Sequence, residues 1–307
     1  MSIDNIQKRI LEEVADLHTI PEGAYNIRAN GESAGRRSTA NIEITSKPNG
    51  SGIDIRILPG TKNESVHIPV VLSESGIKET VYNDFYVGEG SDVLIVAGCG
   101  IHNCGVQDSE HDGIHRFYIG KNARVRYVEK HYGEGEGTGK RILNPGTEVY
   151  MEENSTAEME MVQIRGVDST DRVTTAKLAA GARLIVKERL MTHGSQSAIS
   201  VYKVDLDGEG SSADVVSRSV ARDDSYQKFD ACLTGNAPCH GHTECDSIIM
   251  DRGHILAVPQ LEAVNTDAEL IHEAAIGKIA GDQLIKLMTL GLTEAEAEEQ
   301  IINGFLK

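Results

Sequence analysis

The spacing of apolar residues changes twice along the chain. In the first segment an apolar residue recurs every three or four positions, the period of a helix that buries one face, at Ile3, Ile6, Ile10, Leu11, Val14 and Leu17. Pro21 and Gly23 follow, and both disfavour continuation of a helix. We therefore predict a short amphipathic helix within residues 1–20.

After residue 24 the apolar period becomes two, which is typical of strands. Ile53, Ile55 and Ile57 alternate with polar residues, and the turn-forming segments SKPNGSG and LPGTKN separate runs of this kind. Residues 93–98, VLIVAG, contain no polar side chain. This uninterrupted run predicts a strand that is buried on both faces.

From residue 120 onward a unit recurs in which a turn precedes a small residue and then alternating apolar positions. Six positions are taken as equivalent, with separations of 34, 25, 31, 31 and 24 residues: Ala123, Ala157, Ala182, Ala213, Glu244 and Ala268. An irregular period of this size is typical of a parallel β-helix. We expect a mainly β protein with a parallel β-helix over residues 21–273, and an antiparallel sandwich or jelly roll is the alternative.

Residues 274–307 return to a helical pattern. Thr293 and Glu296 have the spacing of a capping box at the start of a second helix. The apolar face of the first helix stops before Gly291, a residue suited to the position after a helix, and consists of Leu284, Ile285, Leu287 and Met288. We predict a helical hairpin that covers the last coil or binds a partner.

Charge and cysteine content exclude several functions. The 307-residue chain has a formal net charge of −17, which opposes binding to nucleic acid phosphates or anionic lipids. No apolar run reaches the roughly 20 residues that cross a bilayer. Five cysteines are an odd number, which favours reduced thiols over a disulfide framework. We expect a cytoplasmic protein that contacts neither nucleic acid nor membrane.

The segment CHGHTEC concentrates side chains that bind soft or borderline metals, namely Cys239, His240, His242 and Cys245. If this segment is one strand, the two cysteines point to one face and the two histidines to the other. This alternation of faces disfavours a single zinc site with all four residues as ligands.

A second such segment, GCGIHNCG, contains Cys99, His102 and Cys104. As a glycine-rich loop it is a candidate metal site with three ligands, which leaves a fourth position for sulfide, a second chain, His111 or His115. The alternative is a coil turn with buried thiols. Cys232 is expected to lie in the core.

The last sixty or so residues resemble the SufB/SufD family of iron–sulfur cluster assembly scaffolds. The matching motifs are ECDS at 244–247, HEA followed by Lys-Ile at 272–279, Asp-Gln-Leu at 282–284, GLTE at 291–294 and Asn-Gly-Phe at 303–305. Residues 120–243 resemble the family only in their repeated strand pattern. GCGIHNCG and the Cys239-His240 pair have no counterpart in these motifs.

The resemblance implies a right-handed parallel β-helix whose last coil pairs with a second β-helix, and a C-terminal hairpin that docks a SufC-like ABC-type ATPase. It also implies that Cys245 accepts persulfide sulfur or binds the nascent cluster and that Glu273 assists. His272 matches the place of a functional histidine in the SufD branch. Because one chain carries both the cysteine and the histidine, we expect a homodimer, with a cysteine desulfurase or sulfide as sulfur donor.

The residues support the same chemistry. A thiolate accepts sulfane sulfur and binds iron, and a carboxylate adds a hard ligand, so we expect Cys245 and Glu273 to face each other on neighbouring strands. His272, a ligand that the resemblance implies, would share this site with Glu273 only if the strand bends or ends there, because neighbouring strand residues point to opposite faces. No C-x-x-C pair is present, which favours a transient or shared cluster. The sequence GEGEGTGKR at 133–141 lacks the spacing of a phosphate-binding loop, so ATP hydrolysis is assigned to a partner and the chain is expected to be a scaffold, not an enzyme.

Two other functions remain open. One is a zinc-binding structural β-helix protein. The other is a β-helix enzyme that acts on an acidic polysaccharide, which the negative charge disfavours.

Overall fold

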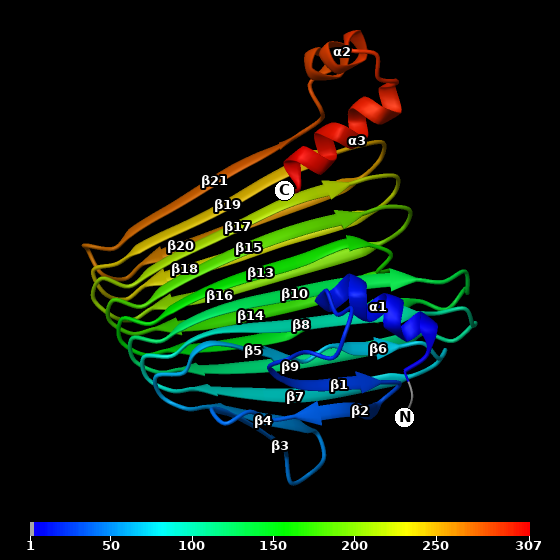
Figure 1. Ribbon diagram of the computed structural model, residues 1–307. Coiled ribbons are helices and arrows are strands. Elements are labelled where there is room, and N and C mark those ends of the chain that lie inside the picture. The colour runs from blue at the N-terminus through cyan, green and yellow to red at the C-terminus, as the bar shows by residue number, and fades with distance from the viewer. Residues whose placement is uncertain (1–2) are drawn as a thin grey trace.

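The computed structural model describes residues 3–307 as a parallel β-helix of about eight turns with helices at both ends (Figure 1). Two sheets form its opposite walls. The first sheet contains β1 (Ala24–Ala29), β2 (Glu32–Arg37), β5 (Lys62–His67), β6 (Val70–Leu72), β8 (Asp92–His102), β10 (Arg124–Glu134), β13 (Thr156–Arg165), β15 (Arg183–Thr192), β17 (Ser212–Ala221), β19 (His240–Ile249) and β21 (Glu269–Gly277).

The second sheet contains β3 (Ile42–Ser46), β4 (Gly52–Ile57), β7 (Lys78–Val87), β9 (Ser109–Ile119), β11 (Arg141–Leu143), β12 (Gly146–Met151), β14 (Ser169–Leu178), β16 (Ser197–Leu206), β18 (Tyr226–Gly235) and β20 (His254–Ala263). From β4 and β5 onward every strand pairs in parallel with the strand one coil away, and antiparallel pairs occur at β1–β2 and β3–β4. The predicted β-helix is thus confirmed, and the sandwich alternative is wrong.

The strand register corrects the predicted equivalence of repeat positions. Arg124 pairs with Thr156 and Thr156 with Arg183, so Ala123 and Ala182 both precede a strand as buried corner residues. Ala157 lies one residue inside its strand instead. The six positions predicted to be equivalent therefore belong to different rows of register partners. The reason is that small residues occur both at corners and at interior strand positions.

The interior of the solenoid is filled by alternate residues of both sheets. Along β13 to β19 every second side chain is buried, as the two-residue period predicts. Aromatic rings from neighbouring coils stack in part of this core, where the centroids of Phe85 on β7 and Phe117 on β9 lie 4.6 Å apart. Inward-facing polar residues such as Glu129, Arg172 and Glu188 interrupt the aliphatic packing.

The N-terminal helix α1 (Asn5–Ala15) covers the outer face of the first sheet. A capping box between Asp4 and Gln7 starts it, and Asp16 ends it in the left-handed conformation, before the predicted stop at Pro21. A β-carbon at Gly98 would lie 2.3 Å from the Val14 carbonyl oxygen, so glycine is required for this close approach. Helix α1 explains why residues 93–98 are largely buried on both faces, as predicted. Met1 and Ser2 of the predicted segment lie outside the described residues.

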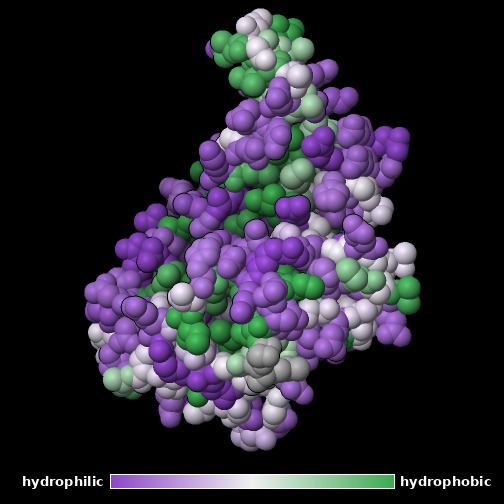
Figure 2. Space-filling view, turned by 45° about the vertical axis from the view of Figure 1, so that its right-hand side comes forward, coloured by the Kyte–Doolittle hydropathy of each residue, from purple (hydrophilic) through white to green (hydrophobic). Residues whose placement is uncertain are grey.

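The C-terminal helices differ in how they contact the solenoid. α3 (Glu294–Phe305) begins with the predicted Thr293–Glu296 capping box and packs Ile302 against Val220 on the outer face of β17. α2 (Gly281–Thr289) has no buried residue and projects beyond the last coil (Figure 1). The apolar surface at the projecting tip is visible in Figure 2. Within residues 3–307 no helix has the length and apolar character needed to span a membrane.

Candidate functional site

The Cys245 thiol lies inside the solenoid, one strand from its C-terminal end. It is 1% exposed and faces the interior from β19, between Ser217 on β17 and Ala274 on β21. The Ser247 hydroxyl lies 3.6 Å from its sulfur. Burial raises the pKa of the Cys245 thiol, and the hydrogen bond to Ser247 partly opposes that rise. Cys245 is therefore enclosed but separated from the uncovered end by a single coil.

Glu273 does not face Cys245, so the predicted contact between the thiol and this carboxylate is wrong. The register places Glu273 opposite Glu244 and Ala274 opposite Cys245. Because neighbouring strand residues point to opposite faces, this offset of one residue turns Glu273 outward. Its side chain is 68% exposed on the outer face of the first sheet.

Glu273 instead joins a group of possible metal ligands on that outer face. One ligand atom from each of His242, Glu244 and Glu273 lies within 4.8 Å of the others. His242 Nδ1 is 2.8 Å from an Asp214 carboxylate oxygen, and its Nε2 is 3.3 Å from Glu273 Oε2. The hydrogen bond to Asp214, followed by that to Glu273, raises the pKa of His242. A carboxylate that holds one imidazole nitrogen while the other faces further ligands is the usual outer-shell arrangement of a metal-binding histidine.

His272 turns inward, on the same face as Cys245 and away from Glu273. It pairs with Thr243, whose hydroxyl lies 2.7 Å from His272 Nδ1. Burial lowers the pKa of His272, and the nearby His242 lowers it further. The three predicted residues of this site are thus divided, with a thiol and an imidazole inside and a carboxylate outside.

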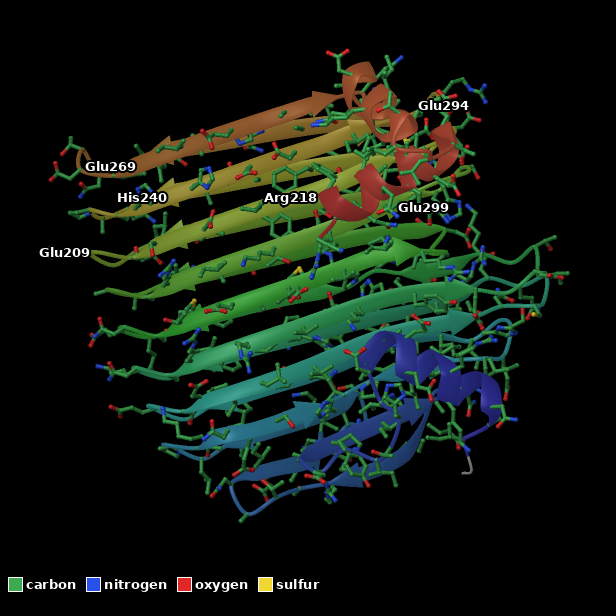
Figure 3. The ribbon with its side chains drawn as sticks, turned by 45° about the horizontal axis from the view of Figure 1, so that its top comes forward. Glu209, Arg218, His240, Glu269, Glu294 and Glu299 are labelled. Carbon is green, nitrogen blue, oxygen red and sulfur yellow. The ribbon has the colours of Figure 1, made fainter. Side chains whose placement is uncertain are left out.

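Cys239 and His240 belong to separate environments. Cys239 is a buried corner residue that precedes β19, a position that Ser211 fills one coil earlier. His240 lies on the outer face at the beginning of β19, 3.7 Å from Glu269 of β21 (Figure 3). The prediction that the cysteines and the histidines of this segment lie on opposite faces of the strand is confirmed. These two residues do not form one metal site.

Cys99 also faces the interior and is 6% exposed. It pairs in register with His131, and His111 approaches from the second sheet. Burial alone would raise the pKa of Cys99, but the His111 and His131 imidazoles lower it to about 7. Burial alone would lower the pKa of His111, but Cys99 and Glu79 raise it to about 10. The sequence analysis named His111 as a possible further ligand beside Cys99, and the two residues do interact. The parts played by His131 and Glu79 were not predicted, although Glu79–His111 and Cys99–His131 are each separated by 32 residues, one coil length.

Cys104 lies outside, on the opposite face of the sheet from Cys99. It is exposed and contacts His102, which in turn contacts Glu134. The prediction that Cys99, His102 and Cys104 wrap one metal ion is therefore wrong, because the sheet separates the first cysteine from the other two. Among residues 3–307, the group around His242 is the one set of three such ligands that converges.

A row of polar groups occupies the interior between the two buried thiols. Arg172 forms an ion pair with Glu129, and its Nε lies 3.8 Å from Glu188. Glu188 accepts a hydrogen bond of 2.7 Å from Ser217, the register neighbour of Cys245. At the other end, Arg172 lies 3.4 Å from His131 beside Cys99. The core between Cys99 and Cys245 is thus hydrogen-bonded as well as aliphatic.

The C-terminal end of the solenoid is not covered within the described chain. β20 and β21 each pair with one strand and leave the other edge free. Leu261 and Ile276, which occupy interior positions in register with Leu233 and Ser247, are each 41% exposed. Free strand edges and exposed apolar residues are features of an interface.

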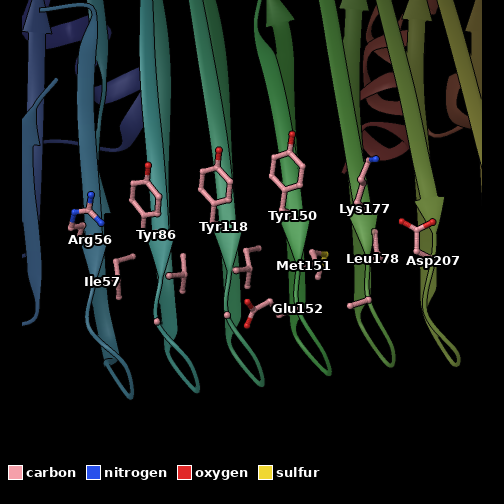
Figure 4. A pocket seen from close by; sticks show the side chains of 15 residues that line it. Arg56, Ile57, Tyr86, Tyr118, Tyr150, Met151, Glu152, Lys177, Leu178 and Asp207 are labelled. Carbon is pink, nitrogen blue, oxygen red and sulfur yellow. The ribbon is translucent and has the colours of Figure 1, made fainter. Parts of the chain in front are cut away.

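A groove of about 610 Å³ lies on the second sheet, away from these thiols (Figure 4). Tyr86, Tyr118 and Tyr150 line it as a stack with centroid separations of 5.1 and 5.2 Å, and the Arg56 guanidinium lies 4.4 Å from the Tyr86 ring centroid. None of the cysteines or histidines discussed above lines this groove. The stack follows from the coil repeat, which places the three tyrosines in register.

Comparison with known proteins places these features in a family. A family model described as the SufBD core domain of SUF system FeS cluster assembly matches residues 79–305. An iron–sulfur cluster assembly SufBD family protein of Methanothermobacter thermautotrophicus is 30% identical over 259 residues, which cover 83% of this chain and 62% of that protein. One from Archaeoglobus fulgidus is 32% identical over 262 residues, or 84% of this chain and 68% of the relative. The chain therefore belongs to the SufBD family of iron–sulfur cluster assembly proteins.

Proposed function

We propose that this chain is a scaffold on which an iron–sulfur cluster is assembled with the help of a SufC-like ABC-type ATPase. Family membership supports a role in cluster assembly. The observation that carries the scaffold role is the pairing of two ligand types on β19, with the Cys245 thiol on its inner face and His242 and Glu244 on its outer face.

The two ligand types suit the two components of the cluster. A thiolate binds sulfane sulfur and iron, whereas imidazole and carboxylate groups bind ferrous iron before sulfide is present. Glu244 and Glu273 are directly opposite on neighbouring strands, an arrangement of like charges that a bound cation would stabilise. Iron and sulfur are therefore received on opposite faces of the first sheet, at β19 and β21. The terminal coil must then move for them to combine.

Dimerisation through the last coil would cover the free edges of β20 and β21. Two-fold pairing of identical edges is the commonest way in which such a surface is closed. A second copy would bring a second set of Cys245, His272 and Glu273 to the same end. A cluster shared between two chains needs fewer ligands from each, which agrees with the absence of C-x-x-C pairs from the sequence.

The ATPase is proposed to dock on α2. Ile285 is 60% exposed and Leu290 is 76% exposed on this projecting hairpin, while α3 anchors it to the solenoid. Movement of α2 by a nucleotide-driven partner would act on β21, because residues 278–280 directly connect the two elements. The ATPase would thus control the coil that separates Cys245 from the uncovered end.

Anaerobic reconstitution tests the scaffold role. The protein is incubated with ferrous iron and sulfide, and bound iron, acid-labile sulfide and visible absorption are measured. Cys245→Ala should abolish cluster loading while circular dichroism stays unchanged. Cys232→Ala is the matched control, and it should load normally. Cys232 is partly exposed on the outward face of β18, so the prediction that it lies in the core is wrong, and it is outside the set of ligands on β19 and β21. Full loading of Cys245→Ala would remove Cys245 from the mechanism.

Copurification tests the ATPase partnership. Ile285→Asp should abolish copurification of the coexpressed ATPase, because the charge lies in the apolar docking surface. Leu58→Asp is the control, since Leu58 is 52% exposed between β4 and β5, far along the solenoid from α2. Unchanged copurification of Ile285→Asp would refute docking on α2.

A further inference from the structure

A second thiol site lies on the outer face of the first sheet, at the ends of β8 and β10. His102 and Glu134 are the last residues of these strands and are register partners. His102 Nδ1 lies 2.9 Å from Glu134 Oε1, and His102 Nε2 lies 3.0 Å from the Cys104 sulfur. The three side chains thus form a thiol–imidazole–carboxylate relay whose sulfur end is exposed.

The loop that carries Cys104 is held by a buried side chain. Asn103 is 0% exposed, and its side chain donates a 2.8 Å hydrogen bond to the Gln107 carbonyl oxygen and accepts one of 3.0 Å from the Gly105 N–H. Gly135 has φ of +107°, and a β-carbon there would lie 2.3 Å from the Asn103 carbonyl oxygen. The position of the thiol over the His102 ring is therefore set by the packing of two neighbouring coils.

Glu134 is suited to orient His102. Besides His102 it contacts the Tyr132 hydroxyl at 2.9 Å and the Arg9 guanidinium of α1. Burial alone would raise the pKa of Glu134, but hydrogen bonds from His102, Tyr132 and Arg9 lower it. An ionised carboxylate on Nδ1 fixes the tautomer in which Nε2 accepts a proton from the thiol.

We infer that Cys104 is a nucleophilic thiol that accepts sulfane sulfur from a persulfide, with His102 as its base and Glu134 as a positioning residue. This inference rests on the proposed scaffold function and specifies how sulfur reaches the chain. His102 takes the Cys104 proton, and the thiolate attacks the outer sulfur of a donor R–S–SH. The bond between Cys104 and that sulfur forms as the donor S–S bond breaks. Both electrons of the broken bond leave on R–S⁻, which takes the proton from His102.

Persulfide fits this site better than an acyl substrate does. Acyl transfer needs N–H donors that stabilise an oxyanion, and the N–H of Gly105, directly after the thiol, is already bonded to Asn103. Sulfur exchange needs no such donors, because the charge develops on the leaving sulfur. The exposed thiol, beside Val106 at 81% exposure, is also accessible to a persulfide carried on another protein.

The test treats the full-length protein with glutathione persulfide and locates the added sulfur by peptide mass spectrometry over time. Cys104 should gain sulfur fastest, and Cys232, which lacks an adjacent imidazole among its hydrogen-bond partners in the described chain, serves as internal control. His102→Asn should slow transfer to Cys104 about a hundredfold. Glu134→Gln should also slow this transfer, whereas Glu134→Asp, which keeps a carboxylate for His102 Nδ1, should restore part of the rate. Transfer to Cys104 no faster than to Cys232, or unaffected by His102→Asn, would overturn the inference.

A second measurement separates this inference from the scaffold function. Cys104→Ser should load a cluster normally from ferrous iron and inorganic sulfide. It should load poorly from ferrous iron and glutathione persulfide, with a reduced flavin supplied to give the two electrons that convert each sulfane sulfur to sulfide. Equal loading of Cys104→Ser and the unaltered protein from persulfide would overturn the role of Cys104 while leaving the scaffold function intact. Failure of the unaltered protein to load from either source would refute the scaffold function, and the labelling rates would still decide the role of Cys104.

Discussion

Replacement of Arg172 by methionine tests the interior polar row. Arg172 is 2% exposed and is the cation that pairs with Glu129, also 2% exposed. Glu188 is nearby but keeps hydrogen bonds from Ser200, Tyr202 and Ser217. Arg172→Met therefore removes the closest cation from Glu129. This buried carboxylate keeps the Tyr127 hydroxyl at 3.0 Å as a donor and His131, whose Nε2 lies 3.7 Å away.

The cost follows from the proton that Glu129 must then bind. In the unaltered protein burial opposes ionisation of Glu129, but Arg172 and His131 hold its pKa well below the usual value. The ionised carboxylate therefore stabilises the fold fully above about pH 4.3, the usual pKa of glutamate, and this stabilisation is lost as the pH falls below that value. In Arg172→Met burial raises the pKa of Glu129, and the remaining His131 opposes that rise only in part. Protonating Glu129 at pH 7 then costs about 3.7 kcal/mol of folding free energy. This is about 1.4 kcal/mol for each of the roughly 2.7 pH units between pH 7 and the usual glutamate pKa of about 4.3. This agrees with the roughly 3–5 kcal/mol lost when one partner of a buried pair is removed.

Urea unfolding at several pH values measures the effect. The loss of unfolding free energy should be about 3.7 kcal/mol at pH 7 and about 1 kcal/mol at pH 5, because protonation becomes easier. Arg124→Met is the matched control, since Arg124 pairs with Glu158 where both side chains are exposed, and it should cost less than about 1 kcal/mol at either pH. A loss that is independent of pH, or equal to that of the control, would refute the account of this buried pair.

Three further outcomes are expected. Asp214→Asn should weaken ferrous iron binding about 10–100-fold by releasing His242, and an unchanged affinity in titration calorimetry would contradict the outer-face iron site. His111→Gln should raise the pKa of Cys99 above about 7, visible as a shift of the thiolate ultraviolet absorbance with pH, and an unshifted titration would show that the imidazole does not stabilise the thiolate. Gly98→Leu should detach α1, so hydrogen exchange of residues 5–15 should accelerate; retained protection would contradict the close packing.

Much of the fold was predictable because the relevant signals are local. The two-residue period after residue 24 and the Thr293–Glu296 capping box depend on neighbouring residues alone, and both are observed. The register is different, because it depends on how many residues each turn between strands uses. Aligning the repeats by their small residues mixed corner positions such as Ala123 with interior positions such as Ala157, because small residues occur at both.

The candidate site shows the consequence of that uncertainty. An offset of one residue places Glu244 and not Cys245 opposite Glu273, and the carboxylate therefore faces outward. The local rule that alternate residues share a face was sufficient to separate Cys239 from His240, since it needs no register. The relay from Cys104 through His102 to Glu134 could have been found from the 32-residue coil length, but the sequence period was too irregular to give that number.

Anaerobic purification with the coexpressed ATPase, followed by iron and acid-labile sulfide analysis, tests the central claim most directly. The scaffold account predicts that the complex carries iron and sulfide together and that Cys245→Ala removes both without dissociating the ATPase. Bound zinc in place of iron, or a Cys245→Ala complex that retains its full iron and sulfide, would contradict it.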